Sequence, residues 1–531
     1  MNISSGSKCV LPVAAVCDRR SPLSHRTFGA HRAPLQDSFV KHLLLIALLS
    51  FTAALSGLAQ KPSPWEKSVV RIEVARKSYD YYQPWNRRND MTAKTGLVVG
   101  KDQILTTAQD LSDATLVRMQ SGGRGAWAIG SVVWVDYYAN LAVLTTSDTN
   151  FWTNLKPAKL QDKPNVTKAP LQILRWREGK LETRQAEFTQ FAVRRSLLSD
   201  INQVCLEVSS EMQDVGYGEP LVADSQVAGL VAVQYGRTCR VIPASFLRMI
   251  LEARRTKPER SLGYFHFYWQ PAENPSTLAN FKLPGKPRGV LVINVPARLD
   301  GAAAMLQPHD IILQIDGFNI DIQGDYTDPD YGPLMLENLA TRGKWAGDDV
   351  KLKIWRDGQE QTVNYRLPKY DFANSLVPAG VYDQPPDYLI VGGLVFQPLT
   401  TPYLQRWGKD WQRNAPFRFN YYRDDEATKA QPSLVILSQV LPDKFNIGYQ
   451  EYRGYVVEKV NDQPVTNLAE LQAALQKPKG EFHVIDFVPN ETLQRIVIAA
   501  GATEQAANRR ILERFGISAA VQITPKNAAA N

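Results

Sequence analysis

Apolar residues between positions 66 and 250 gather in short runs that are separated by glycine and polar turn residues. Strand-like runs at such spacing are typical of a closed all-β domain, either a sandwich or a barrel. The runs predict strands at Ser68–Ala75, Thr95–Val99, Gln103–Thr107, Ala126–Val135, Leu141–Thr145, Leu171–Arg175, Val204–Val208 and Val227–Val233. The pattern alone does not choose between the two architectures.

From about residue 261 the pattern changes, and strands alternate with short helices. A strand at Gly289–Val295 precedes a helix of small residues at Gly301–Met305 and a turn, strand and turn over Leu306–Gly317. A further strand at Val350–Arg356 runs into Asp357-Gly358, a dipeptide that favours a tight hairpin turn. These elements predict an α+β unit.

A second unit of the same kind follows a linker at Leu376–Asp387 that is rich in Pro and Tyr. Its characteristic segments are Val391–Leu399, Ser438–Leu441, Phe445–Tyr449 and Val456–Asn461. A closing helix at Ala502–Phe515 is expected to end at Gly516, because glycine readily takes the left-handed conformation that ends helices.

The N-terminus has the features of an export signal. Lys41 and His42 precede an apolar run at Leu43–Leu55, which is too short to cross a bilayer comfortably. Gly57-Leu58-Ala59 then has the small-x-small pattern of a cleavage site. We predict a signal peptide and export to a periplasmic or extracellular compartment, with an uncleaved membrane anchor as the alternative. Because the segment before the run is long for a leader, we expect the true start near Val40.

Composition and charge narrow the classes of function. A chain of 531 residues is too long for one core and indicates three or four domains. Without residues 1–59, 55 Lys/Arg stand against 51 Asp/Glu, so the net charge of +8 falls to +4, which argues against a nucleic-acid-binding protein. The Arg and aromatic residues of Gln405–Arg423 do not change this, because Asp424-Asp425-Glu426 follows directly. No cysteine or histidine spacing indicates a metal site, and no cofactor is expected.

Four motifs, in order and at family-like separations, resemble the trypsin-like fold of the Deg/HtrA serine proteases. They are Thr95–Gly100 with Ile104–Gln109, Ala139–Leu144, Gly216–Val222 with Val227–Leu230, and Val241-Ile242-Pro243. In the family the corresponding motifs are a Gly-rich strand with Leu-Thr-(Asn/Ala)-x-His, Asp-(Leu/Ile)-Ala-(Leu/Val)-Leu, Gly-Asn-Ser-Gly-Gly-Pro-Leu, and Ile-Pro. The resemblance implies a double β-barrel.

A serine protease needs a hydroxyl nucleophile, an imidazole base and a buried carboxylate that act as one unit. The resemblance places Gln109 at the His position, Asn140 at the Asp position and Tyr217 at the Ser position. A carboxamide accepts no proton near neutral pH, so Gln109 cannot act as general base. Tyr217 puts a bulky phenol where a small hydroxyl should stand. Asn140 agrees with the loss of the His and Ser positions, since a buried Asp without its imidazole would be an unpaired charge.

The oxyanion loop is altered as well. Its positions are Val215, Gly216, Gly218 and Glu219, and Val215 and Glu219 replace two of the glycines that the family uses there. A β-branched residue resists the positive φ angles that glycine permits. We therefore expect the oxyanion hole to be lost together with the triad.

The positions of the histidines support the loss of the triad, and this observation does not depend on any alignment. The histidines are His25, His31, His42, His266, His309 and His483, and none lies between residues 43 and 265. A barrel without histidine cannot use a Ser-His mechanism in any register. The remaining enzymatic alternatives are Ser209, Ser210 or Cys205 with a lysine base, or His266 reaching in from the next domain.

The two α+β units resemble PDZ domains, which bind peptides by strand addition. The second unit, together with Gln83–Arg88, is similar to the plant-type Deg proteases. The resemblance implies that the ligand-carboxylate loop of the first unit is Leu262-Gly263-Tyr264-Phe265, which is aromatic and has no basic residue. Binding of internal segments, or of no peptide, therefore stays open. His309 and Asp310 match turn positions rather than catalytic ones.

Cysteine usage leaves two alternatives. Cys9 and Cys17 lie in the leader, and the barrel prediction places Cys205 and Cys239 on strands that flank the nucleophile loop. A disulfide between them in an oxidising compartment and two buried free thiols are both consistent with the sequence.

We therefore predict a mainly β protein with a leader at 1–59, a degenerate trypsin-like double β-barrel at 60–258, PDZ domains at 261–370 and 385–520, and a tail at 521–531. The predicted function is non-catalytic binding of unfolded or exported polypeptides in protein quality control, as an adaptor, regulator or holdase. The alternative is an active serine endopeptidase that degrades misfolded proteins by a non-standard site. The resemblance implies a trimer-based homo-oligomer, and a third hypothesis is co-assembly with an active homologue.

Overall fold

The computed structural model describes residues 63–525, apart from 168, 200, 257–258, 297–304, 373–374, 409, 424 and 490–491. Contacts separate residues 1–62 from one compact unit that begins at residue 63. The predicted signal peptide, Cys9 and Cys17 lie outside the described residues. Among the helices that are described, none is long and apolar enough to cross a membrane.

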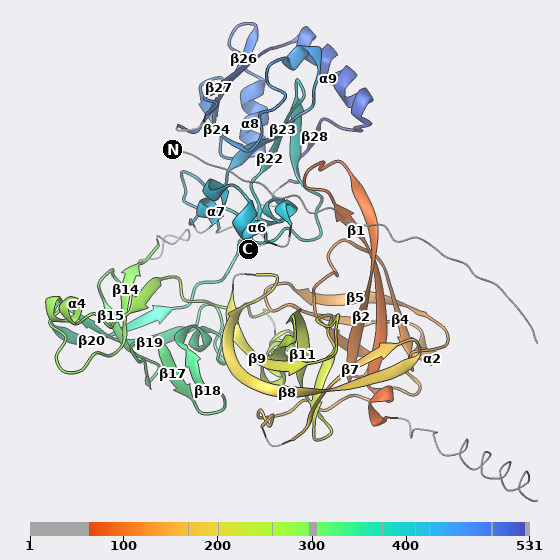
Figure 1. Ribbon diagram of the computed structural model, residues 1–531, viewed down its shortest axis with the longest axis vertical. Coiled ribbons are helices and arrows are strands. Elements are labelled where there is room, and N and C mark those ends of the chain that lie inside the picture. The colour runs from red at the N-terminus through yellow and green to blue at the C-terminus, as the bar shows by residue number, and fades with distance from the viewer. Residues whose placement is uncertain are drawn as a thin grey trace, which may run out of the picture. The chain divides into compact units, whose positions relative to one another are not determined.

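A first set of strands closes into a barrel in the order β1-β2-β3-β6-β5-β4 (Figure 1). Gly96 lies inside this barrel, where an added Cβ would come within 2.4 Å of Ile104 Cγ2, so the close packing of β2 on its neighbours depends on glycine. The strands are β1 (Val69–Tyr79), β2 (Arg87–Gly100), β3 (Gln103–Thr106), β4 (Ala114–Ser121), β5 (Ala128–Asp136) and β6 (Leu141–Thr145).

A second barrel follows in the order β10-β11-β12-β9-β8-β7. Because both sheets are closed, the domain is a pair of barrels and not a sandwich. Helix α3 (Ala244–Ala253) packs Phe246, Leu247 and Ile250 into the apolar core of the barrels. The strands are β7 (Leu171–Arg177), β8 (Lys180–Arg195), β9 (Asn202–Ser210), β10 (Pro220–Ala223), β11 (Gln226–Tyr235) and β12 (Thr238–Pro243), and short helices η1 (Pro64–Lys67) and α2 (Thr149–Trp152) complete the region.

The first C-terminal unit, drawn in green in Figure 1, is a sheet in the order β13-β14-β15-β19-β20 with a separate hairpin, β17-β18. The predicted Asp357-Gly358 turn is confirmed, since both residues have positive φ and join β19 to β20. The helix predicted at Gly301–Met305 lies, except for Met305, outside the described residues. The elements are β13 (Tyr268–Pro271), α4 (Pro275–Asn280), β14 (Val290–Asn294), β15 (Ile311–Ile315), β16 (Phe318–Asn319), β17 (Asp325–Asp328), β18 (Gly332–Met335), η2 (Leu336–Ala340), β19 (Asp349–Arg356) and β20 (Gln359–Arg366).

The second C-terminal unit, drawn in blue in Figure 1, is a sheet in the order β27-β26-β24-β23-β22-β21-β28. The predicted closing helix is confirmed as α9, which ends at Gly516 in the left-handed conformation. The elements are β21 (Tyr388–Val391), β22 (Leu394–Pro398), α5 (Thr401–Leu404), η4 (Gln405–Trp407), α6 (Trp411–Asn414), α7 (Phe417–Arg423), β23 (Val435–Val440), η5 (Lys444–Asn446), β24 (Tyr455–Val460), β25 (Gln463–Pro464), α8 (Leu468–Leu475), β26 (Phe482–Phe487), β27 (Arg495–Ala499), α9 (Ala502–Phe515) and β28 (Val521–Gln522).

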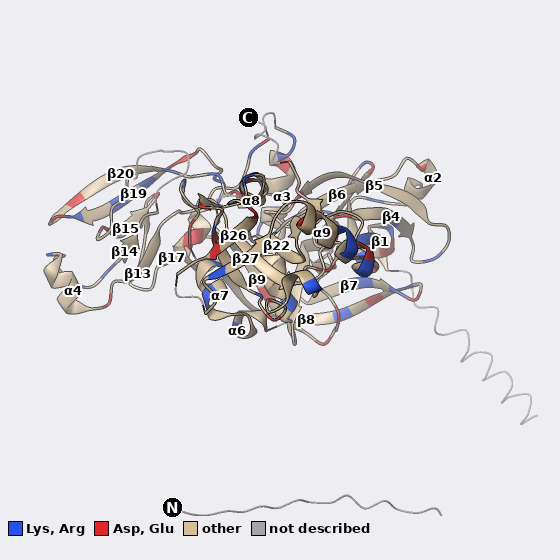
Figure 2. Ribbon diagram, turned by 90° about the horizontal axis from the view of Figure 1, so that it is seen from above, with Lys and Arg blue, Asp and Glu red and all other residues tan. Residues whose placement is uncertain are grey.

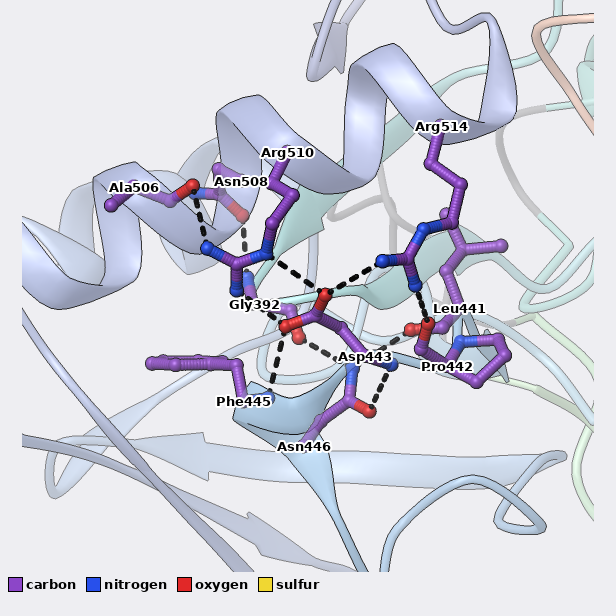
Figure 3. Close-up of polar contacts among 10 residues, drawn as sticks. All are labelled: Gly392, Leu441, Pro442, Asp443, Phe445, Asn446, Ala506, Asn508, Arg510 and Arg514. Carbon is purple, nitrogen blue, oxygen red and sulfur yellow. Dashed lines mark hydrogen bonds and ion pairs between the residues drawn. The ribbon is translucent and has the colours of Figure 1, made fainter.

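Ion pairs attach helix α9 to Asp443, the residue that precedes η5. Figure 2 shows basic residues on α9, and Figure 3 shows two of them, Arg510 and Arg514, reaching Asp443. Arg510 Nη2 lies 2.6 Å and Arg514 Nη2 3.7 Å from the carboxylate, whose side chain is 1% exposed. The hydrogen bonds from Arg510 lower the pKa of Asp443 to about 2. On the same helix, the Asn508 side chain accepts a hydrogen bond from the Gly392 amide at 2.6 Å.

Candidate functional site

The barrels bring the three predicted triad positions together. The Gln109 amide donates to Asn140 Oδ1 at 3.0 Å. The Gln109 carboxamide lies 3.2 Å from the carbonyl oxygens of Gly216 and Ala232, and it donates to both when its nitrogen faces them. Gln109 therefore joins Asn140 of the first barrel to the loop of the second barrel that carries Tyr217.

Asn140 is held by its backbone and by the one hydrogen bond to its Oδ1. Asp136 Oδ1 accepts from the amides of Tyr138 and Ala139, which forms a tight turn before β6. Asn140 follows with a φ of 55°, a left-handed conformation that Asn tolerates better than most residues. Its side chain is buried, and its Nδ2 has no hydrogen-bond partner among the described residues.

The oxyanion-loop positions are satisfied by the chain itself. Glu219 Oε2 accepts from the amides of Gly216 and Tyr217, both at 2.8 Å. The Val215 amide donates to Gln234 Oε1 at 3.3 Å. Glu219 is 2% exposed, and burial raises the pKa of its carboxyl against the opposing effect of these amide donors.

The loop also depends on its two remaining glycines. Gly216 and Gly218 have φ angles of 121° and 93°, which side chains rarely adopt. A Cβ on Gly218 would lie 2.7 Å from the carbonyl oxygen of Thr95. The sequence therefore keeps glycine where the backbone requires it, while Val215 and Glu219 occupy positions that tolerate side chains.

Lys94 lies beside Tyr217 in a pocket of about 340 Å³. Its Nζ donates to Thr107 Oγ1 at 2.9 Å and to the Gln109 carbonyl at 2.7 Å, and it stands 5.9 Å from the centre of the Tyr217 ring. Burial lowers the pKa of Lys94 to about 8, and burial also raises the pKa of Tyr217. No motif in the sequence indicated this lysine.

The structure does not assemble the other enzymatic alternatives. Ser210 Oγ donates to the Gln185 carbonyl, and burial raises the pKa of Cys205 to about 12. His266 belongs to the first C-terminal unit, and its Nε2 lies 3.4 Å from Glu426. Within the described part of the chain, no lysine hydrogen-bonds to Ser209, Ser210 or Cys205.

Cys205 and Cys239 are both free, buried thiols. Cys239 of β12 lies opposite Val208 of β9 in the antiparallel pairing, so the register does not place the two sulfur atoms opposite each other. The disulfide alternative is therefore wrong, and the alternative of two free thiols holds.

A groove of about 510 Å³ opens beside the first C-terminal unit, and Arg195 and Asn202 of the second barrel and Arg423, Asp425 and Glu426 of the second C-terminal unit also line it. It is flanked by Tyr264–Trp269 on one side and by Leu336 and Glu337 of η2 on the other. Of the predicted ligand loop, Tyr264 and Phe265 line this groove. Leu262 is instead buried in the core, and Gly263 forms a β-bridge with Lys369.

In the second C-terminal unit, strand β22 has no open edge within the described residues. It is paired with β23 on one side and with β21 on the other, and β21 is covered in turn by β28. Leu389 and Val391 of β21 pack with Leu468 and Leu471 of α8 in one core. Strand β21 thus lies between β22 and α8, in the position that an added peptide strand would occupy.

The comparison with protein families agrees with a PDZ domain in the second C-terminal unit. A family model described as a PDZ domain matches residues 377–522. The solved structure "HtrA-type protease AlgW with decapeptide" covers 58% of this chain and 96% of its own, at 14% identity and a TM-score of 0.44. By its closed barrels and its PDZ domain, the chain has the trypsin-like fold followed by PDZ architecture.

The homologues of the chain are Deg/HtrA proteases. "Putative protease Do-like 3, mitochondrial" of Arabidopsis thaliana is 26% identical over 417 residues, which are 77% of this chain and 72% of the relative. "Protease Do-like 2, chloroplastic" of the same plant is 25% identical over 474 residues, which are 85% of this chain and 74% of the relative. The resemblance to Deg/HtrA proteases that the motifs indicate is thereby confirmed.

Proposed function

We propose that the protein binds polypeptides without cleaving them. The open groove beside β13 in the first C-terminal unit supports the binding half of this proposal, because an exposed sheet edge can pair with an extended peptide by strand addition. The non-catalytic half is carried by one observation, which is that Glu219 occupies the amides of Gly216 and Tyr217.

An oxyanion hole needs backbone amides that are free to donate to the oxygen of the tetrahedral intermediate. Here the amides of Gly216 and Tyr217 already donate to a carboxylate, and the amide of Val215 donates to the Gln234 side chain. A negative charge that develops on a substrate next to Glu219 would be repelled rather than stabilised. The loop therefore disfavours acyl transfer even if another nucleophile were present.

The groups beside this loop reinforce the proposal. Gln109 cannot take a proton, and Asn140 offers its oxygen to the Gln109 backbone instead of orienting an imidazole. Tyr217 carries a phenol whose pKa is raised by burial, so it is a poorer nucleophile than an unperturbed tyrosine. Each residue is thus unsuited to the role that its position has in an active protease.

A residual peptidase is the second candidate, and Lys94 is the observation that favours it. An amine whose pKa is about 8, 2.9 Å from the Thr107 hydroxyl, has the chemistry of a base and nucleophile pair. Thr107 is fully buried, however, so a peptide carbonyl cannot reach its oxygen without local opening. We therefore rank this candidate second.

The test incubates the purified protein with reduced, alkylated lysozyme and, separately, with a fluorophosphonate probe. We expect intact lysozyme and no labelled serine. Cleavage that disappears in one serine variant would contradict the proposal. Cleavage that survives every serine variant and disappears in Thr107→Val would establish the second candidate instead.

The setting that we propose is outside the cytoplasm, as adaptor, regulator or holdase for exported proteins. The apolar run at Leu43–Leu55 with its cleavage pattern supports this. N-terminal sequencing of the mature protein should give a start close after Ala59. A mature protein that begins within residues 1–42 would contradict it.

A further inference from the structure

The groove of the first C-terminal unit offers an open sheet edge to a ligand. In the described residues, β13 pairs with β14 on one side only and forms the edge of its sheet. Tyr268 and Trp269 of β13 line the groove, and η2 forms its opposite wall. An extended peptide can therefore pair with β13 and place alternate side chains in the groove.

Glu337 on η2 is a carboxylate in this groove without a cationic partner. Its Oε1 accepts from Trp269 Nε1 at 2.9 Å, while its Oε2 is buried and has no hydrogen-bond partner among the described residues. Neither lysine nor arginine forms an ion pair with it in the described part of the chain. Burial raises the pKa of Glu337 accordingly. A buried carboxylate with an unused oxygen is unfavourable by itself and is stabilised by a bound cation.

A second carboxylate faces the same groove. Glu426 accepts a hydrogen bond from the Tyr268 hydroxyl at 3.0 Å and lies 3.4 Å from His266 Nε2. The His266 side chain is 10% exposed, and its Nε2 makes no hydrogen bond in the described structure. Asp371 and Asp425 also line the groove, so its four carboxylates outnumber its two basic side chains, Arg195 and Arg423. The carboxyl terminus of a peptide would therefore meet a lining with net negative charge.

The aromatic residues complete a site for a positive charge. Tyr264, Phe265 and Trp269 line the groove beside Glu337. The face of an aromatic ring attracts an ammonium or guanidinium group, and a carboxylate at the end of such a pocket forms a charge-assisted hydrogen bond with it. The groove thus combines the two kinds of group that bind a lysine or arginine side chain.

We infer that the first C-terminal unit binds an internal polypeptide segment that carries a lysine or arginine, with the positive charge placed against Glu337. The inference rests on the proposed function and specifies its ligand. A free C-terminal carboxylate is not required, because strand pairing with β13 supplies the main-chain contacts and the side-chain charge supplies the selectivity.

The test uses fluorescein-labelled decapeptides of alanine, valine and threonine with one central variable residue and an amidated C-terminus. Fluorescence anisotropy gives the Kd of the full chain for peptides with lysine, norleucine or glutamate at that position. A fourth peptide has the central lysine and a free carboxylate. We expect the lysine peptide to bind about tenfold more tightly than the glutamate peptide. The amidated and free lysine peptides should bind within about twofold of each other.

Two variants assign the preference to the groove. Glu337→Gln should reduce the preference for lysine over glutamate to below about threefold, while Glu360→Gln, on the distant strand β20, should keep it. Because Glu337→Gln retains the shape of the side chain and an oxygen for Trp269, circular dichroism should show the same fold. Equal binding of all three central residues would overturn the inference and leave the proposed function standing. Failure to bind any peptide would overturn both.

Discussion

Lys94 makes a testable contribution to the pH dependence of stability. Burial lowers its pKa from 10.5 to about 8. Below about pH 8 the amine is charged in both the folded and the unfolded state, so the folded state carries the full penalty of a buried charge. As the pH rises through about 8, the folded protein loses this proton while the unfolded chain keeps it. The unfolded state then binds more protons, and stability rises with pH.

The size of the effect follows from the two pKa values. A difference between 10.5 and about 8 corresponds to a penalty of about 3 kcal/mol, because each pKa unit is about 1.4 kcal/mol. Between about pH 7.5 and about pH 9.5, about 2 kcal/mol of this penalty should disappear. Replacement of Lys94 by methionine removes the titrating amine and keeps the apolar stem. Thr107 Oγ1 and the Gln109 carbonyl lose a donor, but that loss does not depend on pH.

The assay is urea denaturation of three proteins at about pH 7.5 and about pH 9.5. The free energy of unfolding of the wild type should rise by about 2 kcal/mol relative to that of Lys94→Met over this interval. Lys101→Met, at an exposed turn, should behave as the wild type does. If Lys94→Met and the wild type change by the same amount, Lys94 is not the buried, neutralised amine that the structure indicates.

Three further predictions concern the barrels and α9. Because burial raises the pKa of Cys205 to about 12 and that of Cys239 to about 11, both should react with iodoacetamide at neutral pH only after unfolding, and rapid labelling of the native protein would disprove their burial. Gly96→Ala should lower the free energy of unfolding, measured in urea, by roughly 1–3 kcal/mol. Gly100→Ala, whose new Cβ would have its nearest neighbour at 3.5 Å, should change it by less than about 1 kcal/mol. Equal effects of the two substitutions would refute the packing argument. Arg510→Ala should lower the thermal midpoint and speed proteolysis at α9, because it removes a charge-assisted hydrogen bond to the buried carboxylate of Asp443. An unchanged midpoint would show that this ion pair does not hold the helix.

The sequence predicted those elements that are marked by local features, such as a run of apolar residues or a glycine at the end of a helix. The runs at Leu141–Thr145 and Ala502–Phe515 agree with β6 and α9 to the residue, because a continuous apolar run marks the strand and a terminal glycine marks the end of the helix. Strand β8 was not predicted. Most of its residues are polar, and only Ala186, Ala192 and Val193 are buried, so its place in the sheet is decided by pairing with β7 and β9.

The candidate site could be predicted only in part, because much of it depends on tertiary contacts. Gln109, Asn140 and Tyr217 were located by motifs, and the barrels do place them side by side. The role of Glu219 was not foreseen: the sequence marked it as a missing glycine, whereas the fold turns its carboxylate back onto two backbone amides. Glu337 gave no sequence signal, since its unused oxygen exists only where η2 faces β13.

The central claim is that the protein binds a polypeptide and leaves it intact, and one measurement tests both parts. Reduced, alkylated lysozyme is incubated with the protein, the complex is isolated by size-exclusion chromatography, and the co-eluting lysozyme is analysed by intact-mass spectrometry. The account predicts that lysozyme co-elutes with the protein at its full mass. Lysozyme that elutes alone, or that co-elutes as fragments absent from the untreated sample, would contradict it.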